Sequence, residues 1–355
     1  MNALIRRPVS PVSRIQSICF AIGLIVLALS STAIAQVNGP GTSDSSLFDT
    51  VINVPEDQVV ISGALGGDGL TTQVNLSDGG SASGLTTANS GTEFNVFGGV
   101  VSSFFNANSG SEINISGGVV ANGFQANAGS LVEIIGGDVS NNFTANAGSL
   151  VNISGGNVGP FFDAQSSVNI SGGSVGGLFG ANFGSQVDIS GGSVESINAT
   201  SGGQVNVGGG SVGSFNALEG SLVTVEGGSL GDFDAFSGSE TNISGGSFGG
   251  VFSAFSESDV NLFGTEFLVD GVLLDGLELG ESFEVDVRDV TLSGLLSDGS
   301  SFEFELISVF NDDDFFASDA NLTVTLTAVV PEPGVAIVMM FGGIGSLLRR
   351  RNRAS

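Results

Sequence analysis

The apolar residues of this chain recur between positions 76 and 262 with a period of about 19 residues, a length typical of solenoid repeats. In each period an apolar anchor residue precedes the sequence Ser-Gly-Gly or a variant of it. A second apolar residue stands two positions before the anchor, as Val151 does before Ile153. The anchors are Leu76, Val96, Ile115, Ile134, Ile153, Ile170, Ile189, Val207, Val225, Ile243 and Leu262. Their residue numbers differ successively by 20, 19, 19, 19, 17, 19, 18, 18, 18 and 19.

Three more apolar positions follow nearly all of these anchors in a constant order. Five residues after it stand Val101, Val120, Val139, Val158, Val175, Val194, Val212, Leu230, Phe248 and Phe267. Eight or nine residues after it stand Phe105, Phe124, Phe143, Phe162, Phe179, Ile197, Phe215, Phe233 and Phe252, each followed two positions later by Ala. The alternation of apolar and polar residues around these positions predicts short strands.

A helix does not fit this pattern, because two Gly residues in each short period would cost it about 1 kcal/mol each and no 3.6-residue stripe is present. Gly corners between short strands do fit, since Gly readily adopts the positive φ of tight turns. We therefore predict an all-β, single-stranded parallel β-helix over residues 76–265, with coils of about 19 residues. Coils stack at about 4.8 Å, which gives a rod of about 50 Å. Stacking buries apolar faces that no single coil can bury.

The regions beside the repeats are predicted to close the two ends of the rod. Residues 266–328 contain the alternating runs "FEVDVRDVTLSGLL", "FEFELISVF" and "LTVTLTAVV", with the turn signal Ser297-Asp298-Gly299-Ser300 between two of them. This pattern predicts a small antiparallel C-terminal cap. Residues 36–75 are interpreted as the N-terminal cap.

Composition and charge narrow the functional classes. The chain has 57 Gly among 355 residues and contains no Lys, His, Trp or Tyr. Between residues 36 and 331 there are 35 acidic residues and one Arg, Arg288, a net charge of −34. Such a surface repels nucleic acid and anionic lipid head groups, so we exclude a nucleic-acid partner.

The N-terminal residues 1–35 have the pattern of a secretory signal peptide. A basic start is followed by the apolar run "ICFAIGLIVLAL" and by Ala33-Ile34-Ala35 before Gln36. Cys19 is the one cysteine of the sequence. Removal of the signal would leave a mature chain without disulfides or thiol chemistry.

The C-terminal residues 329–355 carry a second targeting pattern. Pro331-Glu332-Pro333 precedes an apolar run over residues 334–348 and the charge cluster Arg349, Arg350, Arg351 and Arg353. The apolar run is marginally short for a membrane span, and the Arg cluster favours a cytoplasmic C-terminus. An ordinary C-terminal anchor is the alternative interpretation.

This tail closely resembles the PEP-CTERM sorting signal of Gram-negative bacteria that make exopolysaccharide. The resemblance implies an inner-membrane intermediate, processing by an exosortase-like enzyme, and delivery to the cell surface or extracellular matrix. The same type of tail occurs on some proteins classed with ice-binding proteins, so it indicates a route and no activity. The repeats, with "VNISGGSV" and Phe-x-Ala, resemble the short Gly-Gly repeats of bacterial surface solenoids such as adhesin passenger domains.

The residues offer little catalytic chemistry, and we predict that the chain is not an enzyme. Without His, Lys or Tyr most acid–base and nucleophilic schemes have no members. A glycosidase needs only two carboxylates, yet Asp138, Asp163, Asp188 and Glu195 form no evident pair in the sequence. No cofactor is required. Calcium prefers carboxylate and carbonyl oxygens, and the candidate ligands are Asp312, Asp313, Asp314 and Asp319, with a solvated acidic loop as the alternative.

A polar column is expected on the outside of the anchor strands, because the residue between two inward apolar residues points outward. Its amide members, a candidate ligand face, are Asn95, Asn114, Asn152, Asn169, Asn206, Asn242 and Asn261. Hydrogen bonds along the column could instead serve only the stability of the fold. The pattern as a whole favours an exported structural or adhesive protein of the cell envelope or exopolysaccharide matrix. A polysaccharide-active enzyme, which needs a carboxylate pair in a cleft, and an ice-binding protein, which needs a flat hydroxyl-rich face, are the alternatives.

Overall fold

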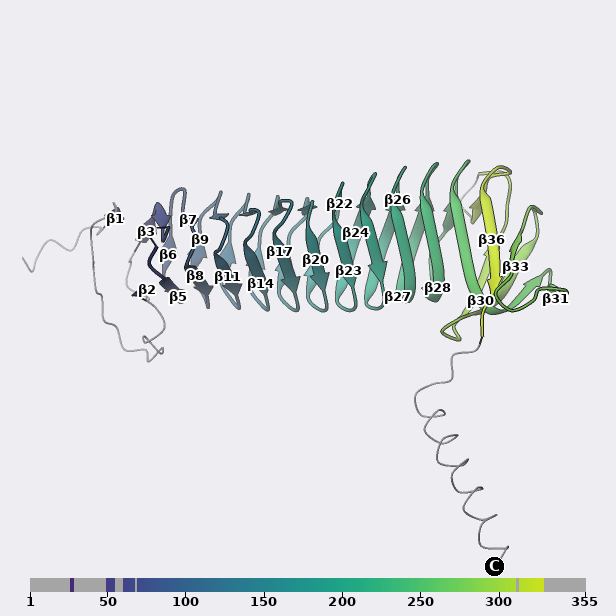
Figure 1. Ribbon diagram of the computed structural model, residues 1–355, viewed down its shortest axis with the longest axis horizontal. Coiled ribbons are helices and arrows are strands. Elements are labelled where there is room, and N and C mark those ends of the chain that lie inside the picture. Colours follow the sequence, from purple (N-terminus) through teal and green to yellow (C-terminus); the bar gives the residue numbers. More distant parts are fainter. Residues whose placement is uncertain (1–25, 29–48, 55–59, 68, 311–312, 329–355) are drawn as a thin grey trace, which may run out of the picture.

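The protein is an elongated rod of stacked coils with a small antiparallel sheet at its C-terminal end (Figure 1). The computed structural model describes residues 26–28, 49–54, 60–67, 69–310 and 313–328. Strands of successive coils pair in parallel and in register along the rod. The predicted fold class, a parallel β-solenoid with coils of about 19 residues and an antiparallel C-terminal cap, is confirmed.

The anchor residues lie on the first strand of each coil. These strands are β2 (Thr50–Val54), β5 (Thr72–Leu76), β8 (Thr92–Val96), β11 (Glu112–Ile115), β14 (Leu131–Ile134), β17 (Leu150–Ile153), β20 (Ser167–Ile170), β23 (Gln186–Ile189), β25 (Gln204–Val207), β27 (Leu222–Ala235), β28 (Glu240–Phe248) and β30 (Asp259–Val269). Each anchor pairs with the anchor of the next coil, as Ile134 does with Ile153 and Ile153 with Ile170.

Two shorter strands complete most coils, whereas β27 contains all three strand positions of its coil and β28 contains the first two. The second strands are β3 (Val60–Ser62), β6 (Ser81–Ala82), β9 (Val100–Val101), β12 (Val119–Val120), β15 (Asp138–Val139), β18 (Asn157–Val158) and β21 (Ser174–Val175). The third strands are β4 (Ala64–Leu65), β7 (Thr87–Ala88), β10 (Asn106–Ala107), β13 (Gln125–Ala126), β16 (Thr144–Ala145), β19 (Asp163–Ala164), β22 (Phe179–Ala181) and β29 (Phe252–Ala254). In β24 (Ser193–Ala199) and β26 (Ser211–Ala217) the second and third strands are continuous.

The core is a set of ladders in which like residues stack on like. The anchors, the Phe residues and the Ala residues that follow them are buried along the rod. The rings of Phe124, Phe143, Phe162 and Phe179 stack with centroids 4.6–4.7 Å apart and ring planes within 7°. Ile197 continues this ladder and is fully buried. The predicted inward positions are thus correct, because each strand alternates and each coil repeats the alternation.

The Gly-Gly corners are required for two different reasons. A Cβ on Gly155 would overlap the carbonyl oxygen of Ile135 in the preceding coil. Gly156 has a φ of +72°, and its Cβ would lie 2.7 Å from the backbone of Gly136. The first Gly therefore permits close stacking and the second permits the left-handed turn. The pair recurs because every coil needs both.

The rod begins earlier than the sequence period indicates. Val54 of β2 pairs with Leu76 of β5, 22 residues later, and is fully buried. Within the described part of the region predicted as an N-terminal cap, residues 36–75, β2, β3, β4 and β5 thus belong to the same parallel ladders. The longer first spacing removes it from the regular period. β1 (Val26–Ala28), inside the predicted signal segment, pairs in parallel with β3.

The C-terminal cap combines antiparallel strands with one last strand of the rod. Its strands are β31 (Val272–Leu273), β32 (Ser282–Glu284), β33 (Thr291–Leu296), β34 (Ser301–Glu305), β35 (Phe315–Phe316) and β36 (Asn321–Leu326). β33 and β34 form the hairpin that the turn signal predicts. β36 pairs antiparallel with β32 and parallel with β30, where Val324 lies opposite Leu262. The chain therefore returns after 62 residues to cover the final coil.

Candidate functional site

The predicted polar column is present on the outer side of the anchor strands and is internally hydrogen-bonded. The side-chain Nδ2 of Asn114 donates to Oδ1 of Asn95 at 3.0 Å, and Asn169 donates to Asn152 at 2.7 Å. Acidic residues take part as acceptors, since Asn206 donates to Asp188 at 2.9 Å. The column begins before the predicted residues, with Asn95 donating to Asn75 and Asn75 to Asn53, and it ends with Asn261 accepting from Thr323. These bonds contribute to the stacking of the coils.

Exposure varies along this amide column. Asn95 is buried, with 6% of its surface exposed, whereas Asn169 and Asn206 are exposed and Asn152 is half-buried. A side-chain amide has two N–H donors and an oxygen with two lone pairs. A bond to one neighbour uses one donor, so an exposed Asn keeps a second donor that this bond does not use. The column is thus able both to stabilise the rod and to present hydrogen-bonding groups.

A second amide column, which the sequence analysis did not identify, follows the buried Ala residues. Asn108 donates to Asn89 at 2.8 Å, Asn127 to Asn108 at 2.9 Å, and Asn146 to Asn127 at 2.9 Å. The signal was available in the repeated phrase "ANAGS". Further along the rod the same position becomes apolar, where the rings of Phe236 and Phe255 stack at 4.7 Å.

The carboxylates named along the repeats act as members of such side-chain ladders. Asp138 accepts a hydrogen bond from Asn157 at 2.8 Å, and Asp163 accepts one from Asn182. Glu195 accepts the backbone N–H of Gly177 at 3.1 Å. Each acid is bonded to an adjacent coil, which explains its place in the repeat without a catalytic role.

Three of the four acidic residues predicted to bind calcium can be described, because Asp312 lies outside the described residues. Asp314 is half-buried and joins the cap to the rod, accepting the N–H of Phe252 at 2.7 Å and that of Glu305 at 3.1 Å. Burial raises the pKa of the Asp314 carboxyl despite these two bonds. Asp313 and Asp319 are exposed. Within the residues that the structure describes, no group of three or more His, Cys, Asp or Glu residues is arranged to hold a metal ion; calcium binding stays a prediction.

The sorting motif Pro331-Glu332-Pro333, the apolar run and the Arg cluster lie outside the described residues, as does most of the predicted signal peptide. No helix in the described part of the chain is long and apolar enough to span a membrane. The targeting predictions therefore depend on the sequence alone.

Comparison with known proteins gives a structural likeness and no sequence match. No protein-family model matches the chain, and no curated protein matches its sequence. The crystal structure of a hyper-glycosylated fragment of TibA, with glycosylation catalysed by TibC, aligns over 59% of this chain and 80% of that chain. The sequence identity is 19% and the TM-score is 0.43. At this similarity, neither activity nor partners transfer to the present chain.

Proposed function

We propose that the protein is an exported, surface-sorted rod that serves as a structural or adhesive component of the cell envelope or its exopolysaccharide matrix, without an enzymatic role. The observation that carries the proposal is the amide column along the anchor strands. Its groups repeat from coil to coil over the length of the rod, so no single coil is distinguished as a catalytic centre. A repeating surface suits a repeating ligand better than a small substrate.

The chemistry of the column favours a neutral or weakly charged polysaccharide. Exposed amides such as Asn169 and Asn206 can donate to and accept from sugar hydroxyls. The net charge of −34 between residues 36 and 331 repels strongly anionic polymers. Because each contact is weak, affinity would come from many coils engaging one polymer chain at once.

Binding of the purified rod to exopolysaccharide from its own organism tests the adhesive role. The double variant Asn169→Thr and Asn206→Thr removes two exposed amides, and Thr224 already occupies this column in the next coil. The matched control, Ser174→Thr and Ser193→Thr, changes two exposed residues on the second strands of nearby coils. We expect the Asn double variant to bind more weakly, with a several-fold higher apparent Kd, and the Ser control to bind as the wild type does. Equal binding by both variants and the wild type would remove the amide column from the proposal.

The route to the surface is the second part of the proposal and rests on the tail. We propose that an exosortase-like enzyme processes the chain at Pro331-Glu332-Pro333 while the apolar run is held transiently in the inner membrane. Pro disfavours helix at the residue before it, so this segment marks an extended boundary beside the apolar run. Mature surface protein should then lack the Arg cluster.

Mass spectrometry of the surface-exposed protein tests this route. Replacing Pro331 and Glu332 by Ala should leave a longer form in the inner membrane. Recovery of the wild-type C-terminal peptide through Ser355 from surface protein would show that the tail is a plain anchor. A rod tethered to the membrane would then replace the sorted, released form.

A further inference from the structure

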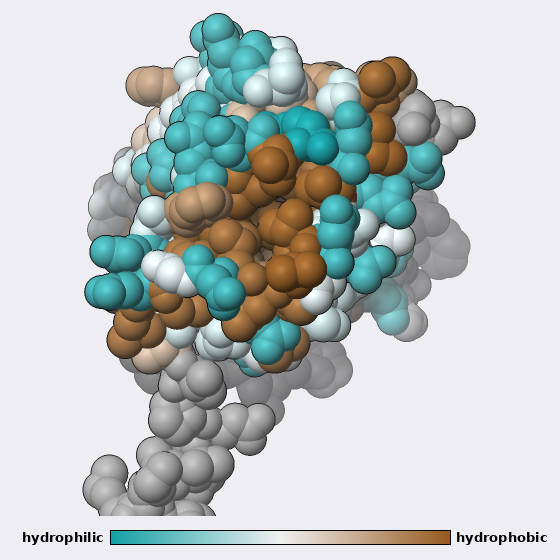
Figure 2. Space-filling view, turned by 90° about the vertical axis from the view of Figure 1, so that its right-hand side faces the viewer, coloured by the Kyte–Doolittle hydropathy of each residue, from teal (hydrophilic) through white to brown (hydrophobic). Residues whose placement is uncertain are grey.

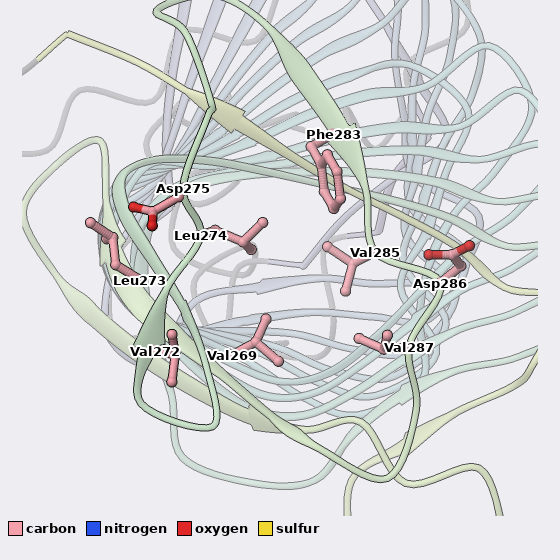
Figure 3. A pocket seen from close by; sticks show the side chains of 9 residues that line it. All are labelled: Val269, Val272, Leu273, Leu274, Asp275, Phe283, Val285, Asp286 and Val287. Atoms are coloured by element: carbon pink, nitrogen blue, oxygen red, sulfur yellow. The ribbon is translucent and has the colours of Figure 1, made fainter.

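The C-terminal cap carries an apolar hollow of about 430 Å³ at the end of the rod. The hairpin of β30 and β31 contributes Val269 and Leu274 to its wall, and the segment that follows β32 contributes Val285. Figure 3 shows these side chains and Phe283 around one space, with Asp275 and Asp286 on opposite sides of it. The space-filling view of this end shows a hydrophobic surface ringed by hydrophilic residues (Figure 2).

The apolar rim of the hollow is open to solvent. Val272 is 69% exposed and Leu273 is 54% exposed, and Phe283 and Val287 are each about half exposed. Apolar side chains gathered in this way gain about 25 cal/mol for each Å² that an occupant covers. Rimmed apolar patches of this type mark interaction surfaces.

The surroundings of the hollow are strongly acidic. Seven exposed acidic residues lie between positions 270 and 289. Arg288 lies among them, but its guanidinium donates to the backbone carbonyls of Val285, Val287, Phe316, Ala317 and Ala320. The rim therefore favours an occupant that is apolar in its middle and basic at its end.

The chain itself supplies such a segment, and it leaves the described structure close to the hollow. Leu326 ends β36 beside β32, where the N–H of Gly280 donates to the carbonyl of Leu326 at 2.8 Å. An extended chain from Ala328 to Met340 spans up to about 40 Å. Residues 337–341 read Ile-Val-Met-Met-Phe, and Met side chains adapt well to irregular apolar space. Four Arg follow closely after residue 348.

We propose that the apolar C-terminal segment, residues 334–348, docks in this hollow of its own chain whenever the segment is outside a membrane, with the Arg cluster held by the acidic rim. The hollow takes a few side chains of the segment. Docking shields the segment from water and from other chains until a bilayer or a membrane enzyme accepts it. This inference is independent of polysaccharide binding.

Disulfide cross-linking in the full chain tests the docking directly, because Cys19 is the one native cysteine. In a Cys19→Ser background, Leu273→Cys is paired with Met340→Cys. The control pairs Met340→Cys with Ser318→Cys, an exposed residue outside the hollow. A freely moving tail would reach both sites with similar effective concentration. We expect the intramolecular yield of the Leu273 pair to exceed that of the control by roughly fivefold, and to fall as salt screens the Arg cluster.

Three results would overturn the proposal. Equal yields for the two pairs would show that the tail does not bind preferentially in the hollow. Dimeric cross-links would assign the hollow to a second copy of the chain. In a separate variant that keeps Cys19 and carries Leu273→Cys alone, a higher intramolecular yield than that of the Leu273→Cys and Met340→Cys pair would assign the hollow to the N-terminal apolar run.

A second measurement avoids cysteine and follows the hollow itself. Amide hydrogen exchange of peptides spanning residues 269–287 is compared between the wild type and the double variant Ile337→Asp and Met340→Asp. Charged residues cannot remain in an apolar hollow without a partner, so exchange should become several-fold faster in the variant. Unchanged exchange in residues 269–287 would contradict docking. As the internal control, a peptide spanning residues 204–222 should exchange at the same rate in both proteins.

Discussion

Two Phe residues that are adjacent in sequence, Phe161 and Phe162, should differ sharply in what they contribute to stability. Phe162 is 1% exposed, and its ring stacks on Phe143 at 4.6 Å and on Phe179 at 4.7 Å. Phe161 is 50% exposed and has a φ of +62°. Substitution of each by Ala removes the same atoms from environments that have little in common.

The expected magnitudes follow from these environments. A buried Phe→Ala change costs about 3–5 kcal/mol in total, and the loss of ring stacks worth about 0.5–1.5 kcal/mol each places a residue high in this range. Phe162→Ala should therefore lie near the upper end, at about 4–5 kcal/mol. Phe161→Ala loses the burial of only half a side chain, about 1 kcal/mol or less.

Hydrogen exchange is the assay. The free energy of unfolding of a stacked solenoid is approximately the sum of the stabilities of its coils and of the contacts between neighbouring coils, so a substitution destabilises mainly its own region. Phe162→Ala should speed exchange in peptides spanning residues 140–185, while those spanning 205–245 serve as the internal reference. Circular dichroism melts provide the global comparison. Equal losses in the two variants would refute the inward register of the Phe ladder.

The remaining predictions concern the anchor ladder, the charge of the rod and the Gly corner. Ile153→Asp buries a charge without a partner between two coils and should cost several kcal/mol. Asn152→Thr on the outer side removes one hydrogen bond to Glu133 without adding a charge and should cost only about 1 kcal/mol; equal shifts in Tm would contradict this. Burial raises the pKa of Asp234, so the folded chain binds the proton more tightly than the unfolded chain, and stability falls as pH rises from the ordinary Asp value through the folded one. Asp234→Asn should therefore raise Tm at pH 7 by roughly 1–2 °C and flatten its pH dependence, and a lowered Tm at pH 7 would count against the desolvation argument. Gly155→Ala, whose Cβ would overlap the carbonyl oxygen of Ile135, should cost about 1–3 kcal/mol in thermal unfolding; a neutral result would mean that the corner relaxes freely.

The ladders could be predicted from sequence because stacking makes each position repeat its own chemistry. Ile153 needs an apolar residue above and below it, and that demand is what the period of about 19 residues records. Where a coil departs from the period, the signal weakens. Val54 joins the anchor ladder at a spacing of 22 residues, outside the regular run. The sequence therefore predicts a cap where the structure has a further coil.

The position of the last strand of the rod could not be predicted from the sequence for a different reason. β36 enters the ladder 62 residues after its partner β30, with the hairpin of β33 and β34 in between. Alternation marks "LTVTL" as a strand, but an alternating strand is equally compatible with parallel and antiparallel neighbours. Its place follows from tertiary packing, since the final coil must cover its apolar edge. The apolar hollow likewise depends on side chains that only the folded cap brings together.

The direction of the hydrogen bonds gives the rod a mechanical character. Strands run across the long axis (Figure 1), so the bonds between coils lie along it. A force applied between the two ends of the rod acts on the hydrogen-bonded contacts between coils in series, and the weakest of these contacts opens first. Each coil that peels away releases about 19 residues, which extend by about 58–64 Å beyond the coil's rise of about 4.8 Å. In the proposed adhesive role, an attachment made through the rod would lengthen in steps under shear and dissipate work at each step, and the coils would restack when the load is removed.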